Sequence, residues 1–144
     1  KWIDGAVAGE IYYSAGDVGI GTNAPSQALD VNGNIVATAY YYSSDVSLKE
    51  DIILLDSALD KVLALEGVSF KWKEDGKESI GLIAQDVEKV YPELVFTDDK
   101  DEKSVQYGNL IAPLIEAVKS QQKMIENQQR QINDLKGEIE NLKE

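Results

Sequence analysis

The sequence predicts an α+β protein in three consecutive parts: a β-rich N-terminal segment, a small mixed domain with hairpins, and a long C-terminal helix that associates with other copies. Three observations predict this order. Short apolar runs separated by Gly, Asn and Pro fill residues 1–42, the pattern changes near Asp56, and an apolar heptad repeat begins at Ile111. With 144 residues, 43% of them apolar, the chain has room for one modest core.

Residues 1–42 are predicted to form short strands. The apolar runs are EIYY, VGI, ALDV and NIVATAYYY, and VNGN at Val31–Asn34 is a hairpin-turn signal. Strands this short, with few bulky apolar side chains, bury little surface by themselves. The segment is therefore expected to form an intertwined or oligomeric β arrangement.

The middle of the chain is predicted to form helices and hairpins. A helix is expected after Asp56 or Ser57 as N-cap, with Gly67 just past its end. The runs VSFKW and SIGLIA, joined by EDGK, indicate a hairpin, and AQDVEKVYPE indicates a short helix that Pro92 stops. LVFT and SVQY flank the acidic loop Asp98–Glu102 as a second hairpin. That loop lacks the spacing and the glycine of a calcium-binding loop, which favours a solvated loop.

The C-terminal segment carries an uninterrupted heptad repeat, with Ile or Val at every a position and Leu or Gln at every d position. So narrow an apolar stripe needs a partner, and no other segment is long enough, so we predict self-association; an intramolecular partner helix is the alternative. The β-branched a positions favour two parallel strands, the glutamines weaken that preference, and the pattern leaves dimer and trimer open. Glu138 at g and Lys143 at the next e position are placed to pair between chains. The a and d residues, here called the seam, are Ile111, Leu114, Val118, Gln121, Ile125, Gln128, Ile132, Leu135, Ile139 and Leu142.

The composition limits the chemistry. The chain has no cysteine and no histidine, so disulfides, thiol nucleophiles and thiolate metal sites are excluded, and the usual general base is missing. The formal charge of −12 opposes binding to nucleic acid or to an anionic membrane. There is no charged-then-apolar leader and no long apolar run. We predict no cofactor, no metal ion, and neither a nucleic-acid nor a membrane partner.

Ser44 and Lys49 are the candidate reactive pair. Five residues apart, they would point to opposite faces of a straight strand about 16 Å apart, and would lie about 140° apart on an α-helix. Contact therefore requires a bend between Asp45 and Leu48, or a lysine from another copy of the chain. From spacing alone, an ordinary polar surface is the commoner interpretation.

Three motifs in order carry a family resemblance. They are YYYSSDVSLKEDI, with Ser44, Asp45, Leu48, Lys49 and Ile52 at the signature positions; GLIAQDVEKVYPELV at Gly81–Val95; and YGNLIAPLIEAVKS at Tyr107–Ser120. Together they resemble the intramolecular chaperone domain at the C-terminal end of phage tailspikes, tail fibres and endosialidases. That serine–lysine self-cleaving peptidase family also includes a domain of the myelin regulatory factor. The preceding VGIGTNAPSQALDVNGNI is similar to β modules that often come before this domain.

The resemblance implies a homotrimer in which residues 1–43 end a fibre or spike β stem, 44–108 form the chaperone and autoprotease domain, and 109–144 form a parallel coiled coil. Such a domain registers the preceding triple-stranded stem and then releases itself between Ser43 and Ser44. By the same resemblance, Ser44 is the nucleophile and Lys49 the general base of a single-turnover peptidase. The precursor would belong to a virion tail fibre or spike and fold in the host cytoplasm, and the released domain would be absent from the mature fibre.

Self-cleavage sets an electrostatic condition. A general-base lysine must be uncharged, whereas a lysine in water keeps its proton at neutral pH. Desolvation or nearby cations must therefore act on Lys49, and trimer packing is expected to provide them. The alternative function is a permanent trimerisation or receptor-binding tip in which Ser44 and Lys49 are ordinary surface residues. An enzyme acting on external substrates is disfavoured, because the sequence contains no other catalytic constellation.

Overall fold

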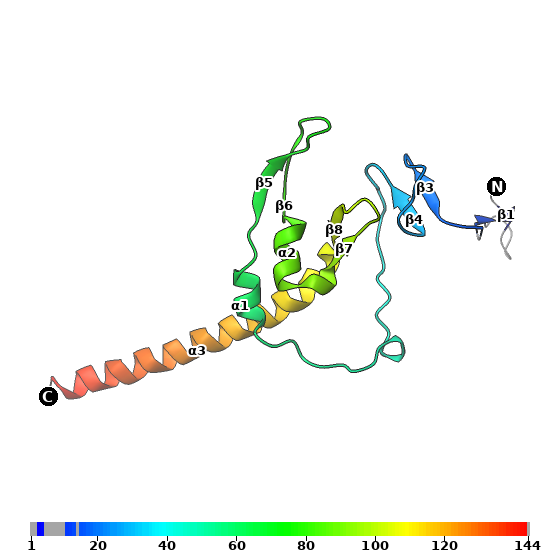
Figure 1. Cartoon of the computed structure of the whole chain (residues 1–144). Helices are drawn as coiled ribbons and strands as arrows, with labels where there is room; N and C mark the ends of the chain where they lie inside the picture. The colour runs from blue at the N-terminus through cyan, green and yellow to red at the C-terminus, as the bar shows by residue number, and fades with distance from the viewer. Residues whose placement is uncertain (1–2, 5–10, 14, 144) are drawn as a thin grey trace. The chain divides into compact units, whose positions relative to one another are not determined.

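The computed structural model describes residues 3–4, 11–13 and 15–143, which form two compact units, Lys1–Asp51 and Ile52–Glu144. The described strands form four two-stranded sheets, and a long helix ends the chain (Figure 1). The chain is thus a mixed α/β protein with small sheets and a long C-terminal helix, as the sequence predicts. Trimeric assembly, the stem and the boundaries at 43/44 and 108/109 stay predictions.

The first unit contains two strand pairs. β1 (Ile3–Asp4) pairs with β2 (Ile11–Tyr12) in antiparallel orientation, and β3 (Val18–Ile20) pairs in parallel with β4 (Leu29–Val31). The glycine at position 19 allows a close backbone approach, because a Cβ there would lie 2.3 Å from the Thr22 carbonyl oxygen.

The hairpin predicted at Val31–Asn34 is wrong. β4 pairs with the strand before it, and residues 32–45, all of which are described, contain no strand. The backbone N–H of Asn32 donates to the Ile20 carbonyl at 2.9 Å, which continues the β3–β4 pairing instead of starting a new turn of antiparallel sheet. The run NIVATAYYY is therefore irregular and exposed rather than paired, and Tyr41 is 96% exposed.

The second unit confirms the predicted helices and hairpins, except that the first helix ends at Leu63 with Ala64 as its C-cap, earlier than the end predicted beside Gly67. Ser57 is the N-cap residue of the first helix, although its side chain makes no cap hydrogen bond. Pro92 follows the second helix and begins a 3-10 turn, as its missing N–H favours. Both hairpins are antiparallel. The elements are α1 (Ala58–Leu63), β5 (Val68–Lys71), β6 (Glu78–Gly81), α2 (Ala84–Val90), η2 (Pro92–Leu94), β7 (Val95–Thr97), β8 (Lys103–Val105), η3 (Tyr107–Leu110) and α3 (Ile111–Asn141).

A small core joins α2 to the β7–β8 hairpin and to the start of α3. Its buried residues are Val87, Tyr91, Leu94 and Leu110, with Leu65, Leu82, Val90, Val95 and Val105 packed around them. Burial, with a smaller contribution from Glu93, raises the pKa of Tyr91, so its hydroxyl stays neutral. The Lys61 ammonium lies 5.8 Å from the centre of the Tyr91 ring, a cation–π contact from α1.

Gly81 and Tyr107 connect two of the sequence motifs. The Leu82 backbone N–H donates to the Tyr107 hydroxyl at 2.8 Å. A Cβ at Gly81 would lie only 2.7 Å from the same hydroxyl oxygen. Glycine at position 81 therefore lets Tyr107 approach the end of β6 and take the hydrogen bond.

Gly81→Ala is expected to destabilise the second unit by about 1–3 kcal/mol, because the new methyl group displaces the Tyr107 hydroxyl. Denaturant unfolding followed by circular dichroism measures the change. Gly67→Ala is the matched control, since no atom lies within 4 Å of a Cβ there. Tyr107→Phe alone costs about 1 kcal/mol, and in the double variant the two effects should not add. Equal effects of the two glycine changes would contradict this account.

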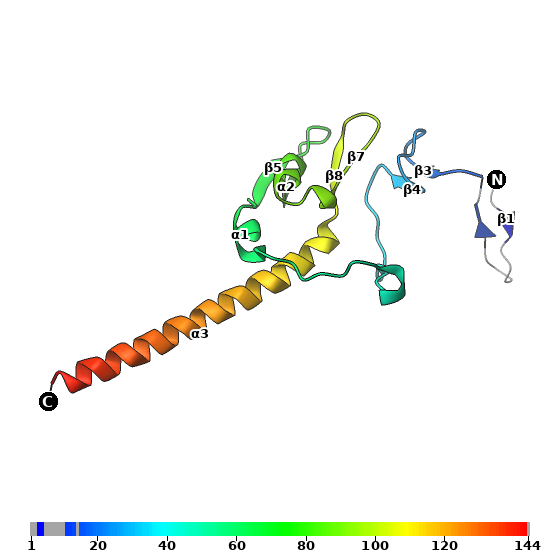
Figure 2. The ribbon, with the colours of Figure 1, turned by 60° about the horizontal axis from the view of Figure 1, so that its bottom comes forward.

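Helix α3 leaves its seam uncovered. α1 packs beside the first turns of α3, where Pro113 and Ala117 are buried (Figures 1 and 2). The seam lies on another face: Ile125 is 52% exposed and Ile132 45% exposed. The short α1 is thus the helix that packs on α3 within the second unit, and it does not cover the seam. Among the described residues, no helix has the length and apolarity needed to cross a membrane.

Candidate functional site

The segment between Ser44 and Lys49 forms a tight turn. Asp45 is extended, with φ −62° and ψ 140°, and caps a 3-10 turn at Val46–Leu48 (η1). Its carboxylate accepts hydrogen bonds from the Ser47 backbone N–H at 2.8 Å and from the Ser47 hydroxyl at 2.7 Å. Lys49 N–H then donates to the Val46 carbonyl at 3.1 Å, which closes the turn.

This turn brings the candidate pair together. Lys49 Nζ lies 2.7 Å from Ser44 Oγ, within one chain. The requirement for a bend between Asp45 and Leu48 is therefore met, and no second copy is needed for the contact. The structure places the two side chains in hydrogen-bond contact next to the Ser43–Ser44 bond; the roles of nucleophile and base stay predictions.

Ser47 is a contributor that the sequence reasoning missed. The Asp-x-Ser spacing at Asp45 and Ser47 is a signal for such a local cap, because an Asp side chain readily accepts from the N–H two residues on. The hydrogen bond from the Ser47 hydroxyl, followed by that from its backbone, lowers the pKa of Asp45 below its ordinary value. Asp45 is therefore held as a carboxylate that faces Ser47.

The pair lies in an exposed stretch of the chain that is rich in apolar residues. Residues 40–55 are exposed throughout. Val46 and Leu48 lie inside the turn segment, and Ile52–Leu55 follow it as an apolar run in which Leu54 is 88% exposed. In the single chain the Lys49 amine is the donor and the Ser44 hydroxyl the acceptor of their hydrogen bond. Base catalysis requires the opposite direction of this hydrogen bond.

Asp45→Ala is expected to open the turn and to lower its population by roughly three- to ten-fold, because the Ser47 donors lose their acceptor. The Lys49–Ser44 side-chain nuclear Overhauser effect and the Ser47 amide shift measure this. Asp45→Asn keeps an acceptor oxygen and should preserve the turn. Since the pKa of Asp45 is lowered on folding, its contribution is complete above the ordinary carboxyl value and is lost as pH falls through the folded value. An identical acid response in Asp45→Asn would contradict the capping role.

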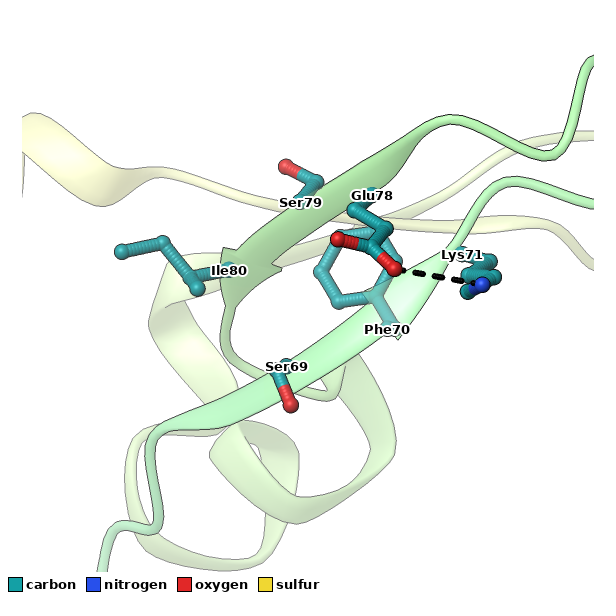
Figure 3. Close-up of a pocket in the computed structure, with 6 residues that line it drawn as sticks. All are labelled: Ser69, Phe70, Lys71, Glu78, Ser79 and Ile80. Carbon is teal, nitrogen blue, oxygen red and sulfur yellow. Dashed lines mark ion pairs between the residues drawn. The ribbon is translucent and has the colours of Figure 1, made fainter.

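In two hollows of the second unit, the described lysines pair with other side chains and not with a serine hydroxyl. One is lined by the β5–β6 hairpin, where Lys71 Nζ pairs with Glu78 Oε1 at 3.1 Å and Ile80 points outward (Figure 3). A larger groove of about 640 Å³ lies beside Phe70, Trp72 and Tyr107 and has a largely apolar lining. Within the described part of the chain, no three His, Cys, Asp or Glu residues are grouped as metal ligands.

Comparison with known proteins adds a family to this geometry. Residues 44–96 match the family model described as the chaperone of endosialidase. The chain is 33% identical over 111 residues to the long tail fiber protein Gp37 of Salmonella phage S16, which covers 69% of this chain and 15% of that protein. It is 40% identical over 96 residues to Gp37 of Enterobacteria phage K3, covering 60% of this chain and 8% of that protein. Myelin gene regulatory factor-like A of Dictyostelium discoideum is 30% identical over 132 residues, 81% of this chain and 14% of that protein.

The family match includes the candidate pair and most of the elements of the second unit up to β7. It begins at Ser44 and takes in Lys49, the β5–β6 hairpin, α2 and the core residues Val87 and Tyr91. The chain spans no more than 15% of the length of these relatives, so the match identifies a domain. Through residues 44–96 the chain belongs to the chaperone of endosialidase family.

Proposed function

We propose that this domain is an intramolecular chaperone of a phage-type tail fibre or spike, which trimerises, sets the register of the preceding β stem, and then cuts itself free between Ser43 and Ser44. The observation that carries the proposal is the 2.7 Å contact between Lys49 Nζ and Ser44 Oγ beside that bond. The family match from residue 44 and the tail fiber proteins among the relatives support the fibre context. After release, the domain is absent from the mature fibre.

The proposed chemistry is an intramolecular acyl transfer. Ser44 Oγ attacks the carbonyl carbon of Ser43 while neutral Lys49 takes the hydroxyl proton. The C–N bond breaks, the Ser44 nitrogen leaves as an amine after receiving that proton, and an ester joins Ser43 to Ser44 Oγ. Water then hydrolyses the ester, which leaves a carboxylate on Ser43 and a free amine on Ser44. The side chain is tethered next to its target, so orientation supplies much of the rate. Asp45 and Ser47 act as positioning residues, because they hold the turn.

Assembly is the proposed switch. In the single chain, the pair and the apolar residues around it are exposed. Packing of three copies over Val46, Leu48 and Ile52–Leu55 would remove water from Lys49, and three amines in one assembly would also repel one another. Both effects favour the neutral amine that base catalysis needs. An unassembled chain keeps the lysine solvated and is idle.

The chaperone role follows from the order in which contacts form. Three interleaved strands gain contacts only once the chains are in register, and such non-local pairing is slow. A coiled coil that associates first raises the effective concentration of the stem segments. The exposed segment 34–43 supports this role, because its backbone has no strand partner within the described part of its own chain. The loops of both hairpins and the exposed Trp72 beside the first of them are proposed to contact the stem from outside. Release then leaves the stem kinetically trapped.

The test is a denaturing gel of the expressed chain with N-terminal sequencing of its products. The proposal expects a fragment that begins at Ser44 and a native mass of three copies. An intact chain that forms stable trimers would instead support a permanent trimerisation or receptor-binding tip.

A further inference from the structure

Two seam positions of α3 carry amides in place of apolar side chains. Gln121 and Gln128 occupy consecutive d positions and are exposed. Within the described residues, neither amide has a hydrogen-bond partner on its own helix. The next glutamine in each case is satisfied locally: Gln122 donates to Glu126 Oε1 at 2.9 Å, and Gln129 donates to Asn133 Oδ1 at 3.0 Å. The seam amides are thus the ones left without partners.

We propose that Gln121 and Gln128 select the axial register in which copies of α3 associate, by pairing only with the same amides of the other copies. The inference rests on the proposed self-association of the chain. When parallel helices align without a shift, each amide lies level with identical amides, and the N–H of one donates to the oxygen of the next. The polar layers are then satisfied although they are enclosed, as polar seam residues that specify register require.

A shift by one heptad breaks this pairing. Gln128 of the shifted copy still meets Gln121 of its neighbour. Gln121 of the shifted copy now lies level with Leu114, and its Leu135 lies level with the neighbour's Gln128. Two layers then enclose amides without partners, and each unpaired amide disfavours the state by roughly ten-fold. In an antiparallel arrangement d residues face a residues, so both glutamines would lie against Ile or Val.

Apart from the end layers, which lose their overlap, the other features of the seam do not oppose that shift. Every a position is Ile or Val, so the apolar layers are interchangeable. Glu138 at g faces Lys143 at e in the unshifted arrangement, and it faces Lys136 after a shift of one heptad. The charge complementarity therefore favours a parallel second copy but tolerates the slip. Among the layers that still overlap, the two amide layers are the ones that distinguish the unshifted from the shifted alignment.

The consequence reaches the stem. One heptad is about 10.5 Å of helix, which equals about three residues of extended strand. A slipped assembly would deliver three stem segments, and three Ser43–Ser44 bonds, at different levels. The glutamines lower the stability of the coil but specify the alignment that a stem of interleaved strands needs.

Relocating the amides tests the proposal. The variant Gln121→Leu with Leu135→Gln carries its amides at positions 128 and 135. Mixed with the wild-type seam, it is expected to align one heptad out of register, because only then do both amide layers match. The chain has no cysteine, so one engineered cysteine per chain reports the alignment by disulfide formation, all in a Ser44→Ala background that prevents cleavage.

Two alternative cysteine placements, one the reverse of the other, report the direction of the shift. Ile132→Cys in the wild-type seam with Ile139→Cys in the relocated variant is expected to cross-link at least about ten-fold more than the reverse placement. An off-seam control, Gln122→Leu with Lys136→Gln, makes the same kinds of change at e positions and should give no directional preference. Equal cross-linking in the two placements, or a preference for the reverse one, overturns the proposal.

A second variant tests the proposal if the relocated chain does not assemble. Gln121→Leu with Gln128→Leu should raise the thermal midpoint of the coil and increase the one-heptad-slipped cross-link relative to the wild type by at least about ten-fold. An unchanged ratio overturns the inference. Sedimentation distinguishes failure of the proposed assembly from failure of this inference. A monomeric wild type rejects the proposed assembly itself, whereas a trimeric wild type without directional cross-linking rejects only the role of the glutamines.

Discussion

Chains that carry Ser44→Ala are expected to remain uncut, with no detectable fragment starting at residue 44. Removal of the hydroxyl removes the atom that would form the ester, and no histidine or cysteine can replace it. A denaturing gel with N-terminal sequencing measures the outcome. Ser43→Ala is the matched control: it changes the neighbouring serine but keeps the attacking hydroxyl, so its cleavage should stay within a few-fold of the wild type.

Lys49→Ala should slow the same cleavage by about 10²–10⁴-fold, the range for loss of a general base. Lys49→Arg keeps the charge but not a group that can become neutral, so it should be as inactive as alanine. Full activity of Ser44→Ala or Lys49→Arg would reject the self-cleavage mechanism and favour the permanent trimerisation tip.

Glutamates at Ile125 and Ile132 are expected to make the chain monomeric and to stop cleavage. Both side chains lie on the exposed seam, and an unpaired charge enclosed in a helix interface costs about 3–5 kcal/mol. The combined cost of several such charges exceeds the free energy of association that the remaining apolar layers provide. Sedimentation gives the mass, and the gel gives the cleavage rate of the same sample.

The control for this variant places the same charges away from the seam. Asn127→Glu and Gly137→Glu lie at c and f positions, and no atom lies within 4 Å of a Cβ at Gly137. This chain should assemble and cleave normally. A monomeric seam variant that cleaves at the wild-type rate would show that the Ser44–Lys49 contact suffices alone and that assembly is not the switch.

Local signals predicted much of the fold. Turn residues between alternating apolar runs predicted the β5–β6 and β7–β8 hairpins, and Pro92 predicted the end of α2. The β4 pairing was not predictable in this way. The Asn-Gly signal at Val31–Asn34 reports a local turn preference, whereas the choice between the preceding and the following segment as strand partner depends on contacts across β3 and β4.

The candidate pair was likewise not predictable from regular local geometry. Regular strand or helix geometry separates Ser44 from Lys49, and the short cap that Asp45 makes with Ser47 brings them to 2.7 Å. Family motifs pointed to the pair, and the Asp-x-Ser spacing would have pointed to the turn.

By itself, the sequence determined the order of the elements, the limits on possible chemistry and the seam of α3, because composition, turn residues and periodicity act over a few neighbouring positions. Only the tertiary structure decided which strands pair, that Tyr107 approaches Gly81, and that α1 packs beside the seam without covering it. These outcomes depend on which side chains meet across the fold, and no local pattern contains that information.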